Sequence, residues 1–338
     1  MDLRAQLARL KTSCGVRDPV GEHCAVLPEP PGAALDAASG APQSATNASA
    51  ALPSPPASSP AASLAERLRE LGRVRSPPAD RREALAALAR HAGGELVAPG
   101  LLLVERQHAL PFGHGQVCIG FAEGMEIDVP VRRRLSLRAR AADLALLDTE
   151  TSGLAGGTGT LVFLVGIARF ASGALLVRQW LMTSFAAEAA MLAEVRAALA
   201  DAACLVTYNG KSFDVPLLKT RFALVRGSHP FAALAHADLL HATRRRLHRH
   251  WPDCRLRTAE SRALGFARHD DLPGAQVPVA WQRWLRHGDA NAVPRVLAHN
   301  RLDLLSLAAL LELHRHPTNS ETPLLQSLDS FRSSAAIC

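Results

Sequence analysis

Residues 144–170 read LALLDTETSGLAGGTGTLVFLVGIARF, and this stretch decides the fold class. It opens with a short apolar run that ends in the acids Asp148 and Glu150, which is typical of a buried strand. A glycine-rich connection, of the kind that tight turns need, leads to a second apolar run at 161–170. We therefore expect two neighbouring strands, with two carboxylates where the first strand ends.

Three further segments extend this pattern toward the C-terminus. ALLVRQWLM at 174–182 predicts a third strand, and AAEAAMLAEVRAALADA at 186–202 predicts an amphipathic helix. ACLVTYN at 203–209 predicts a fourth strand, and the remainder up to about residue 316 is expected to be mostly helical. Three consecutive strands, a helix, a strand and then helices indicate an α/β fold with a mixed sheet flanked by helices.

Composition divides the rest of the chain. Residues 1–62 are rich in Ala, Pro and Ser, and we predict that they are mostly disordered, because such segments bury too little apolar surface to fold. Residues 63–140 show two helical patterns and two short strand-like runs, which predict a small α+β extension. The main domain then covers 141–316, and the polar residues 317–338 are expected to form a flexible tail.

Composition and charge limit the classes of function. The chain has 338 residues and a formal net charge of +7, a balance that suits a partner made of phosphates. Only three of its cations are lysines. A composition this rich in arginine can also result from a GC-rich genome, so the charge alone does not indicate function. No apolar run reaches the roughly 18 residues that span a bilayer, and the N-terminus lacks a secretory signal, so we expect a cytoplasmic protein without a membrane partner. The six cysteines have no zinc-site spacing.

Asp148 and Glu150 lie two residues apart, so in a strand their side chains point to the same face. Two carboxylates side by side repel each other, and the neighbouring apolar run adds a desolvation cost. A divalent cation resolves that conflict. The alternative interpretation is a polar strand end with a capping role.

Two later segments carry further acids. Asp214 follows the fourth predicted strand, where it could also serve as a helix N-cap, and nearby Lys211 is either a solvated charge or a phosphate contact. His299 and Asp303 lie four apart in a predicted helix and share a face, as a surface ion pair would too. Hard oxygen ligands from separate segments favour Mg²⁺ or Mn²⁺ over zinc.

Taken together, the order and spacing of these segments resemble the four-carboxylate exonucleases of the ribonuclease-H-like superfamily. The nearer resemblance is to a bacterial family of ribonuclease-H-like domain proteins that are predicted exonucleases. The residues that carry it span about 143–314, roughly half of the chain. They are LLDTETSGLAGGTGTLVFLVGIARF, LVTYNGKSFDVPLLKTRF, HADLLHATRRRL and LAHNRLDLLSLAAL.

This resemblance implies a metal-dependent nuclease that hydrolyses phosphodiester bonds of DNA or RNA, in the 3′→5′ direction, by a two-metal mechanism. Two Mg²⁺ or Mn²⁺ ions about 4 Å apart would be held by four carboxylates. The four are Asp148, Glu150, Asp214 and Asp303. His299 would accept the proton of the attacking water.

The turn after the fourth predicted strand would line the path of the terminal nucleotide, or else would only be a packed turn. Its residues are Tyr208, Asn209, Lys211 and Phe213. Phe213 would contribute by stacking on a base. One spacing departs from the pattern, because in relatives with a His base the His lies five residues before the last Asp, and in relatives with Tyr it lies four before. His299 occupies the four-residue spacing. Asp238 is interpreted either as a fifth acid or as a helix N-cap.

Two other functions stay open at this point. One is a non-catalytic nucleic-acid-binding or scaffold domain of the same fold, and the presence of all four acids favours catalysis over it. The other is endonucleolytic cleavage by a ribonuclease-H-like fold. The His–x–x–x–Asp helix favours the exonuclease branch of that fold.

Overall fold

The computed structural model describes four stretches of the chain, which are residues 79–133, 135–153, 159–247 and 251–315. The predicted disordered segment 1–62 and the predicted tail 317–338 lie outside the described residues. So does most of the glycine-rich connection, at 154–158. Among the described residues, every helix is too short or too polar to cross a bilayer.

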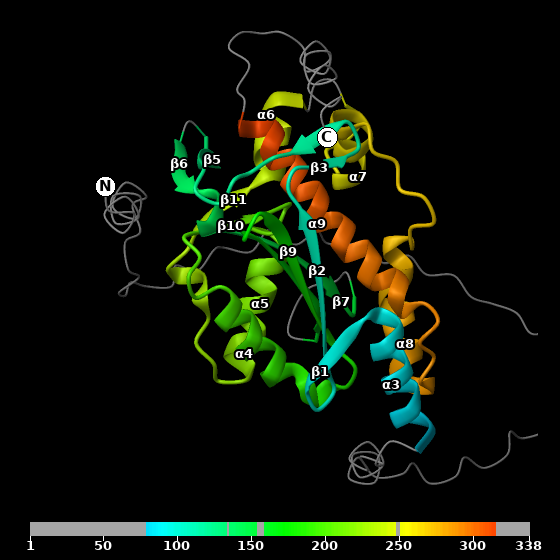
Figure 1. The fold of residues 1–338 in the computed structure, drawn as a ribbon. Helices are drawn as coiled ribbons and strands as arrows, with labels where there is room; N and C mark the ends of the chain where they lie inside the picture. The colour runs from blue at the N-terminus through cyan, green and yellow to red at the C-terminus, as the bar shows by residue number, and fades with distance from the viewer. Residues whose placement is uncertain (1–78, 134, 154–158, 248–250, 316–338) are drawn as a thin grey trace, which may run out of the picture. The chain divides into compact units, whose positions relative to one another are not determined.

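A seven-stranded sheet forms the centre of the described part (Figure 1), in the order β1-β2-β9-β8-β7-β10-β11. The strands from β1 to β7 in this order pair antiparallel, whereas β10 pairs parallel with both β7 and β11. The mixed sheet of the predicted α/β fold is therefore confirmed. The strands are β1 Gly94–Ala98, β2 Leu101–Ala109, β7 Leu144–Thr151, β8 Val162–Ala171, β9 Ala174–Met182, β10 Cys204–Thr207 and β11 Ala235–Asp238.

Helices cover both faces of the sheet, with α4 and α5 on one side and the long α9 on the other (Figure 1). The α-helices of the described residues are α3 Ala79–Ala92, α4 Glu188–Ala198, α5 Asp214–Leu224, α6 Leu239–Leu247, α7 Leu256–Ala259, α8 Val277–His287 and α9 Val293–Arg315. A π-helical turn, Glu260–Leu264, continues α7. Two small hairpins complete the fold, β3 Phe112–His114 with β4 Val117–Ile119, and β5 Glu126–Arg132 with β6 Leu135–Arg140.

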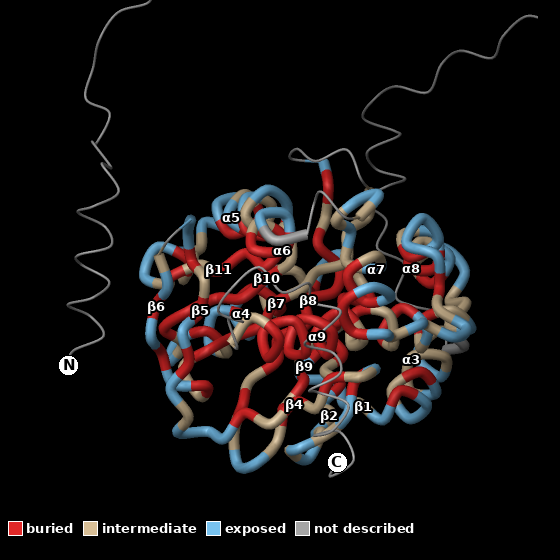
Figure 2. The backbone as a smooth tube through the Cα atoms, turned by 90° about the horizontal axis from the view of Figure 1, so that it is seen from above, coloured by how far each residue is buried: buried red, intermediate tan, exposed pale blue. Residues whose placement is uncertain are grey.

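The buried residues gather on the central strands and on α9, as Figure 2 shows. α9 can approach the sheet closely because strand β8 presents a glycine to it. A Cβ on Gly166 would meet Asn300 Oδ1 at 2.2 Å and Leu304 Cδ1 at 2.8 Å, so a larger residue would push the helix away. In the pairing of β7 with β8, Gly166 lies opposite Asp148, so this close contact with α9 lies beside that acid.

The four strands that the sequence predicts after residue 141 are present, and two details differ from expectation. β11 falls in a region predicted to be mostly helical, because a four-residue AHAD strand is too short to show a period. β1 and β2, from the predicted extension 63–140, pair through β9 with the same sheet. The division of the chain at residue 140 stays a prediction.

Candidate active site

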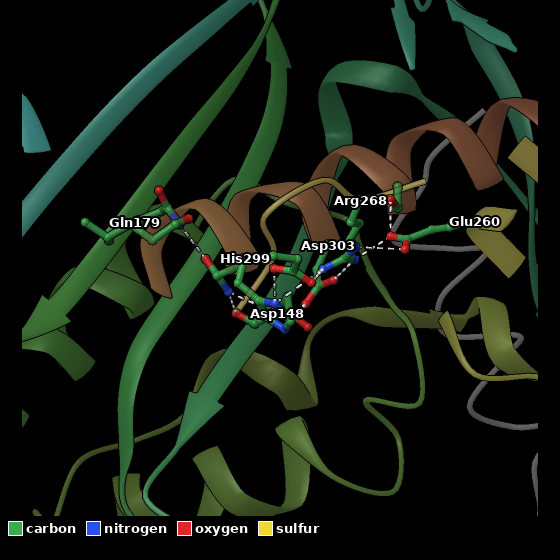
Figure 3. Close-up of polar contacts among 10 residues, drawn as sticks. Asp148, Gln179, Glu260, Arg268, His299 and Asp303 are labelled. Carbon is green, nitrogen blue, oxygen red and sulfur yellow. Dashed lines mark hydrogen bonds and ion pairs between the residues drawn. The ribbon is translucent and has the colours of Figure 1, made fainter. Parts of the chain in front are cut away.

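The acids of β7 meet the polar residues of α9 on one face of the sheet (Figure 3). Asn300 Nδ2 donates to Asp148 Oδ2 at 2.8 Å, and its own Oδ1 accepts from Gln179 Nε2 at 2.8 Å. Gln179 and Asn300 are fully buried, so this chain of hydrogen bonds fixes Asp148 against the helix. Besides burial, the charge of Asp303 raises the pKa of both Asp148 and Glu150, as expected if the two side chains lie on the same face of the strand.

Glu150, His299 and Asp303 form a compact group. One ligand atom from each of the three lies within 4.8 Å of the others, a spacing that could hold a metal ion. His299 Nε2 lies 3.7 Å from Asp303 Oδ2. His299 Nδ1 lies 2.7 Å from Asp271 Oδ1, so Asp271 holds the imidazole from behind and leaves Nε2 turned toward the carboxylates.

Asp214 is the first residue of α5 and lies at the same end of the sheet. The N-cap position belongs to Phe213, so Asp214 does not cap the helix with its side chain. Thr149 Oγ1 donates to Asp214 Oδ1 at 2.5 Å, which ties the start of α5 to β7. Burial raises the pKa of Asp214 to about 6 even though this hydrogen bond favours the charged form.

The four acids Asp148, Glu150, Asp214 and Asp303 repel one another, and this repulsion adds to the effect of burial on the pKa values of Asp148 and Glu150. Burial raises the pKa of Asp148 well above its usual range, and the charges of Asp303, Glu150 and Asp214 raise it further. Burial also raises the pKa of Glu150, followed by the charges of Asp303 and Asp214. A divalent cation among these oxygens would favour the charged forms, because an opposite charge offsets both the repulsion and the loss of water.

Arg268 is a counter-charge inside this group, and no sequence pattern indicates its role. Its guanidinium is 4% exposed and bonds to Asp303 Oδ1, to Asp271, and to Glu260 from Nε at 2.8 Å. Glu260 belongs to the π-helical turn, a kind of helix defect that often occurs at functional sites. Arg268 thus binds Oδ1 of Asp303, and Asp271 binds Nδ1 of His299. Oδ2 of Asp303 and Nε2 of His299 remain on the side of the β7 acids.

A cleft of about 550 Å³ opens beside the carboxylates. Its walls include Asp148, Asp214 and most of the predicted substrate residues, namely Tyr208, Asn209 and Phe213. Phe213 is 61% exposed, which leaves its ring open to a ligand. Lys211 does not line the cleft, because its Nζ donates to Val131 O at 2.8 Å.

Asp238 organises the turn that carries these residues. Its carboxylate is buried and accepts hydrogen bonds from the backbone N–H groups of Asn209, Lys211 and Leu240, at 2.8, 3.0 and 3.1 Å. Asn209 has a left-handed backbone with φ of 68°, which asparagine tolerates better than most residues. Because these donors occupy the Asp238 carboxylate, the capping interpretation suits it better than that of a fifth acid of the cluster.

Comparisons with known proteins give a consistent family. A family model described as the RNase H superfamily matches residues 145–314, which is half of the chain. An uncharacterized protein, YprB of Bacillus subtilis (strain 168), is 40% identical over 174 residues, which cover 50% of this chain and 41% of that protein. The chain thus spans less than half the length of this curated relative.

Among solved structures, the family B DNA polymerase from the hyperthermophilic archaeon Pyrobaculum calidifontis is similar with a TM-score of 0.40 and 13% identity. The similarity covers 68% of this chain and 30% of the polymerase chain.

Proposed function

This chain belongs to the RNase H superfamily, and from that premise we propose that it is a metal-dependent nuclease that trims nucleic acid in the 3′→5′ direction. One observation carries the proposal. Carboxylates from β7, α5 and α9 lie near one another at one end of the sheet, and two of them, Asp148 and Asp214, line a cleft together with the exposed ring of Phe213. Arg268 pairs with Asp303, but burial of the remaining like charges side by side still costs free energy that a bound cation would offset.

The donor set fits Mg²⁺ or Mn²⁺. Hard carboxylate oxygens predominate, and among the described residues the group contains no cysteine, which disfavours zinc. We propose Asp148, Glu150, Asp214 and Asp303 as the ligands of two ions. When bound, the ions would supply Lewis acidity toward a phosphodiester.

His299 is proposed to accept the proton of the attacking water. Its Nδ1 is engaged by Asp271 at 2.7 Å, and its Nε2 faces the carboxylates, so a water held there would lie within reach of a free lone pair. The Asp271 carboxylate accepts from Nδ1–H and so favours the tautomer whose Nε2 can take up the proton. Asp271 is therefore a positioning residue in this scheme.

The cleft walls would hold the end of a strand. Phe213 offers an exposed ring on which a base can stack, and Tyr208 and Asn209 lie beside it. The protein needs to supply little further chemistry, because positioning and charge neutralisation account for most of phosphoryl-transfer catalysis.

The decisive experiment is a cleavage assay on 5′-labelled single strands and duplexes of DNA and RNA, with Mg²⁺ or Mn²⁺. A ladder of shortened products is expected, and full chelation should abolish it. Asp148→Asn should lower the rate by roughly two orders of magnitude or more, because it removes a metal ligand. Asp201→Asn is the matched control, since Asp201 is an exposed acid outside the cleft.

Other outcomes would redirect the proposal. Internal cuts in place of a ladder would favour an endonuclease of this fold. Tight binding of nucleic acid without cleavage under any metal condition would favour a non-catalytic binding or scaffold domain.

A further inference from the structure

The β3–β4 hairpin lies outside the residues that the family model matches, yet its turn contacts the segment that carries Arg268. The hairpin packs against α9 (Figure 1). Gln116 N donates to Leu264 O at 2.7 Å, and the ring of His114 lies against that of Phe266, with 4.1 Å between their centroids. Leu264 is the last residue of the π-helical turn, so the hairpin holds the start of the stretch that leads to Arg268.

Glycines on both sides allow the hairpin and this segment to approach closely. Gly115 has a left-handed backbone with φ of 64°, and a Cβ on it would overlap the backbone oxygen of Leu264. A Cβ on Gly265 would overlap the side chain of Gln116. Gly113 differs, although it belongs to the same hairpin, because a Cβ on it would meet no described atom within 4 Å. The contact is therefore sensitive to one added methyl group at Gly115 and insensitive to the same group at Gly113.

A chain of hydrogen bonds runs from the hairpin to a proposed metal ligand. His114 Nε2 lies 2.9 Å from Ser306 Oγ, and the Ser306 hydroxyl donates to Glu260 Oε1 at 2.6 Å. A hydroxyl has one proton, and Glu260 accepts it, so His114 donates its own Nε2 proton to Ser306. Arg268 Nε donates to Glu260 Oε2 at 2.8 Å, and Arg268 Nη2 donates to Asp303 Oδ1 (Figure 3). Each donor in the chain thus has the acceptor that the next residue offers.

Burial makes this chain of hydrogen bonds specific. His114, Ser306 and Glu260 are all buried, so water does not readily replace a lost partner. Burial also lowers the pKa of His114 to about 4, which keeps the ring neutral near pH 7, with the single N–H that the chain requires. A change at the hairpin is therefore transmitted to Glu260 and is not absorbed by solvent.

We propose that His114 and Ser306 are positioning residues of the active site, and that the β3–β4 hairpin fixes the Asp303 carboxylate through Glu260 and Arg268. A ligand set that is held loosely binds its ion weakly, because the supporting residues set the geometry of the ligands. Loss of such a supporting residue typically costs 10–100-fold in metal affinity or activity. The effect on metal and on cleavage rests on the proposed function, whereas the coupling of the hairpin to Asp303 does not.

The first test disturbs the contact between the hairpin and Leu264. The affinity of the full chain for Mn²⁺ is measured by titration calorimetry, and kcat and KM are measured on an end-labelled oligonucleotide. Gly115→Ala should weaken Mn²⁺ binding by roughly tenfold or more and lower kcat, while KM for the oligonucleotide stays close to normal because the cleft is unchanged. The matched control is Gly113→Ala, which adds the same methyl group to the same hairpin and should leave all three quantities unchanged.

The second test breaks the hydrogen-bond chain and leaves the hairpin in place, which guards against a folding defect in Gly115→Ala. Ser306→Ala removes the link between His114 and Glu260, and it should also weaken Mn²⁺ binding and lower kcat by roughly tenfold or more. Its matched control is Thr183→Val, which removes a buried hydroxyl that donates to Gly100 O at 3.0 Å, outside the cleft. The control should bind Mn²⁺ and turn over as the unmodified chain does.

The third test needs neither metal nor cleavage. His114→Phe keeps a ring beside Phe266 but cannot donate to Ser306. Combined with Asp303→Asn in urea unfolding in chelator, its effect on the free energy of unfolding should be non-additive, because the two residues share one network. Thr183→Val combined with Asp303→Asn should be additive, as expected of independent sites.

Additive effects of His114→Phe and Asp303→Asn would overturn the proposal, because the hairpin would then act locally. In a chain that binds Mn²⁺ and cleaves, equal Mn²⁺ affinity and kcat in Ser306→Ala and Thr183→Val would overturn it as well, and the nuclease function would stand. If the unmodified chain neither binds Mn²⁺ nor cleaves, but His114 and Asp303 are coupled in unfolding, only the proposed nuclease function fails.

Discussion

Replacement of the buried cation of the site, Arg268→Gln, tests how the carboxylates are held. Glu260 is 1% exposed, and the change would leave it with the hydroxyl of Ser306, at 2.6 Å, in place of a charged partner. Removing one partner of a buried ion pair costs about 3–5 kcal/mol, since the other charge stays buried without compensation. For a domain of this size that loss lowers the thermal midpoint by roughly 6–20 °C.

The assay is thermal and urea unfolding followed by circular dichroism, in chelator so that no metal compensates for the lost cation. Arg178→Gln is the control, because its partner Glu105 is exposed and the two side chains are 45% and 40% accessible. An exposed pair contributes about 0–1 kcal/mol. Arg268→Met combined with Glu260→Met should recover part of the loss, because it removes the charge left unpaired at Glu260, although Asp271 and Asp303 still lack their cation. Equal stability of the Arg268 and Arg178 variants would refute the reasoning.

Three further predictions follow from the fold and the site. His299→Ala should lower the maximal rate roughly 10²–10⁴-fold in the end-labelled cleavage assay. His299→Tyr should retain more activity than His299→Ala, because a Tyr base lies four residues before the last Asp in some of the exonucleases that this motif resembles. Equal, near-normal rates for both variants would exclude a general base at this position. Gly166→Ala should cost about 1–3 kcal/mol in urea unfolding, since its Cβ would strike Asn300, whereas Gly274→Ala, with open space around it, should cost far less. Burial, with the charges of Arg268 and His108, lowers the pKa of His114 to about 4 from about 6.5, so the unfolded chain binds the proton more tightly. The stability that neutral His114 contributes is then fully present above pH 6.5 and is lost as the pH falls toward 4. In urea titrations, the free energy of unfolding should fall less between pH 7 and pH 4 for His114→Gln than for the unmodified chain.

The acids of β7 were predictable because a period of two is visible within a single strand. Asp148 and Glu150 end an apolar run, and their shared face needs no knowledge of the rest of the chain. The helix that carries His299 and Asp303 was predictable on the same grounds, since a spacing of four defines a helical face.

The partners of these residues were not predictable. Arg268 and Asp271 belong to an irregular segment without periodicity, and their roles depend on which helix that segment lies against. The role of Asp238 depends on the parallel pairing of β10 with β11, which places Asp238 opposite Thr207 and so beside the turn. Such information is long-range, and local patterns do not contain it.

The hydrogen bond from Asn300 to Asp148 joins residues 152 positions apart in the chain. During synthesis, β7 leaves the ribosome long before α9 exists, so the acids of β7 spend that interval without the helix that orders them. Contacts of such high sequence separation form late and slow the folding of a domain. The group of carboxylates can therefore be complete only after residue 303 has emerged, and a growing chain exposed to nucleic acid at the ribosome would not yet hold the whole proposed site.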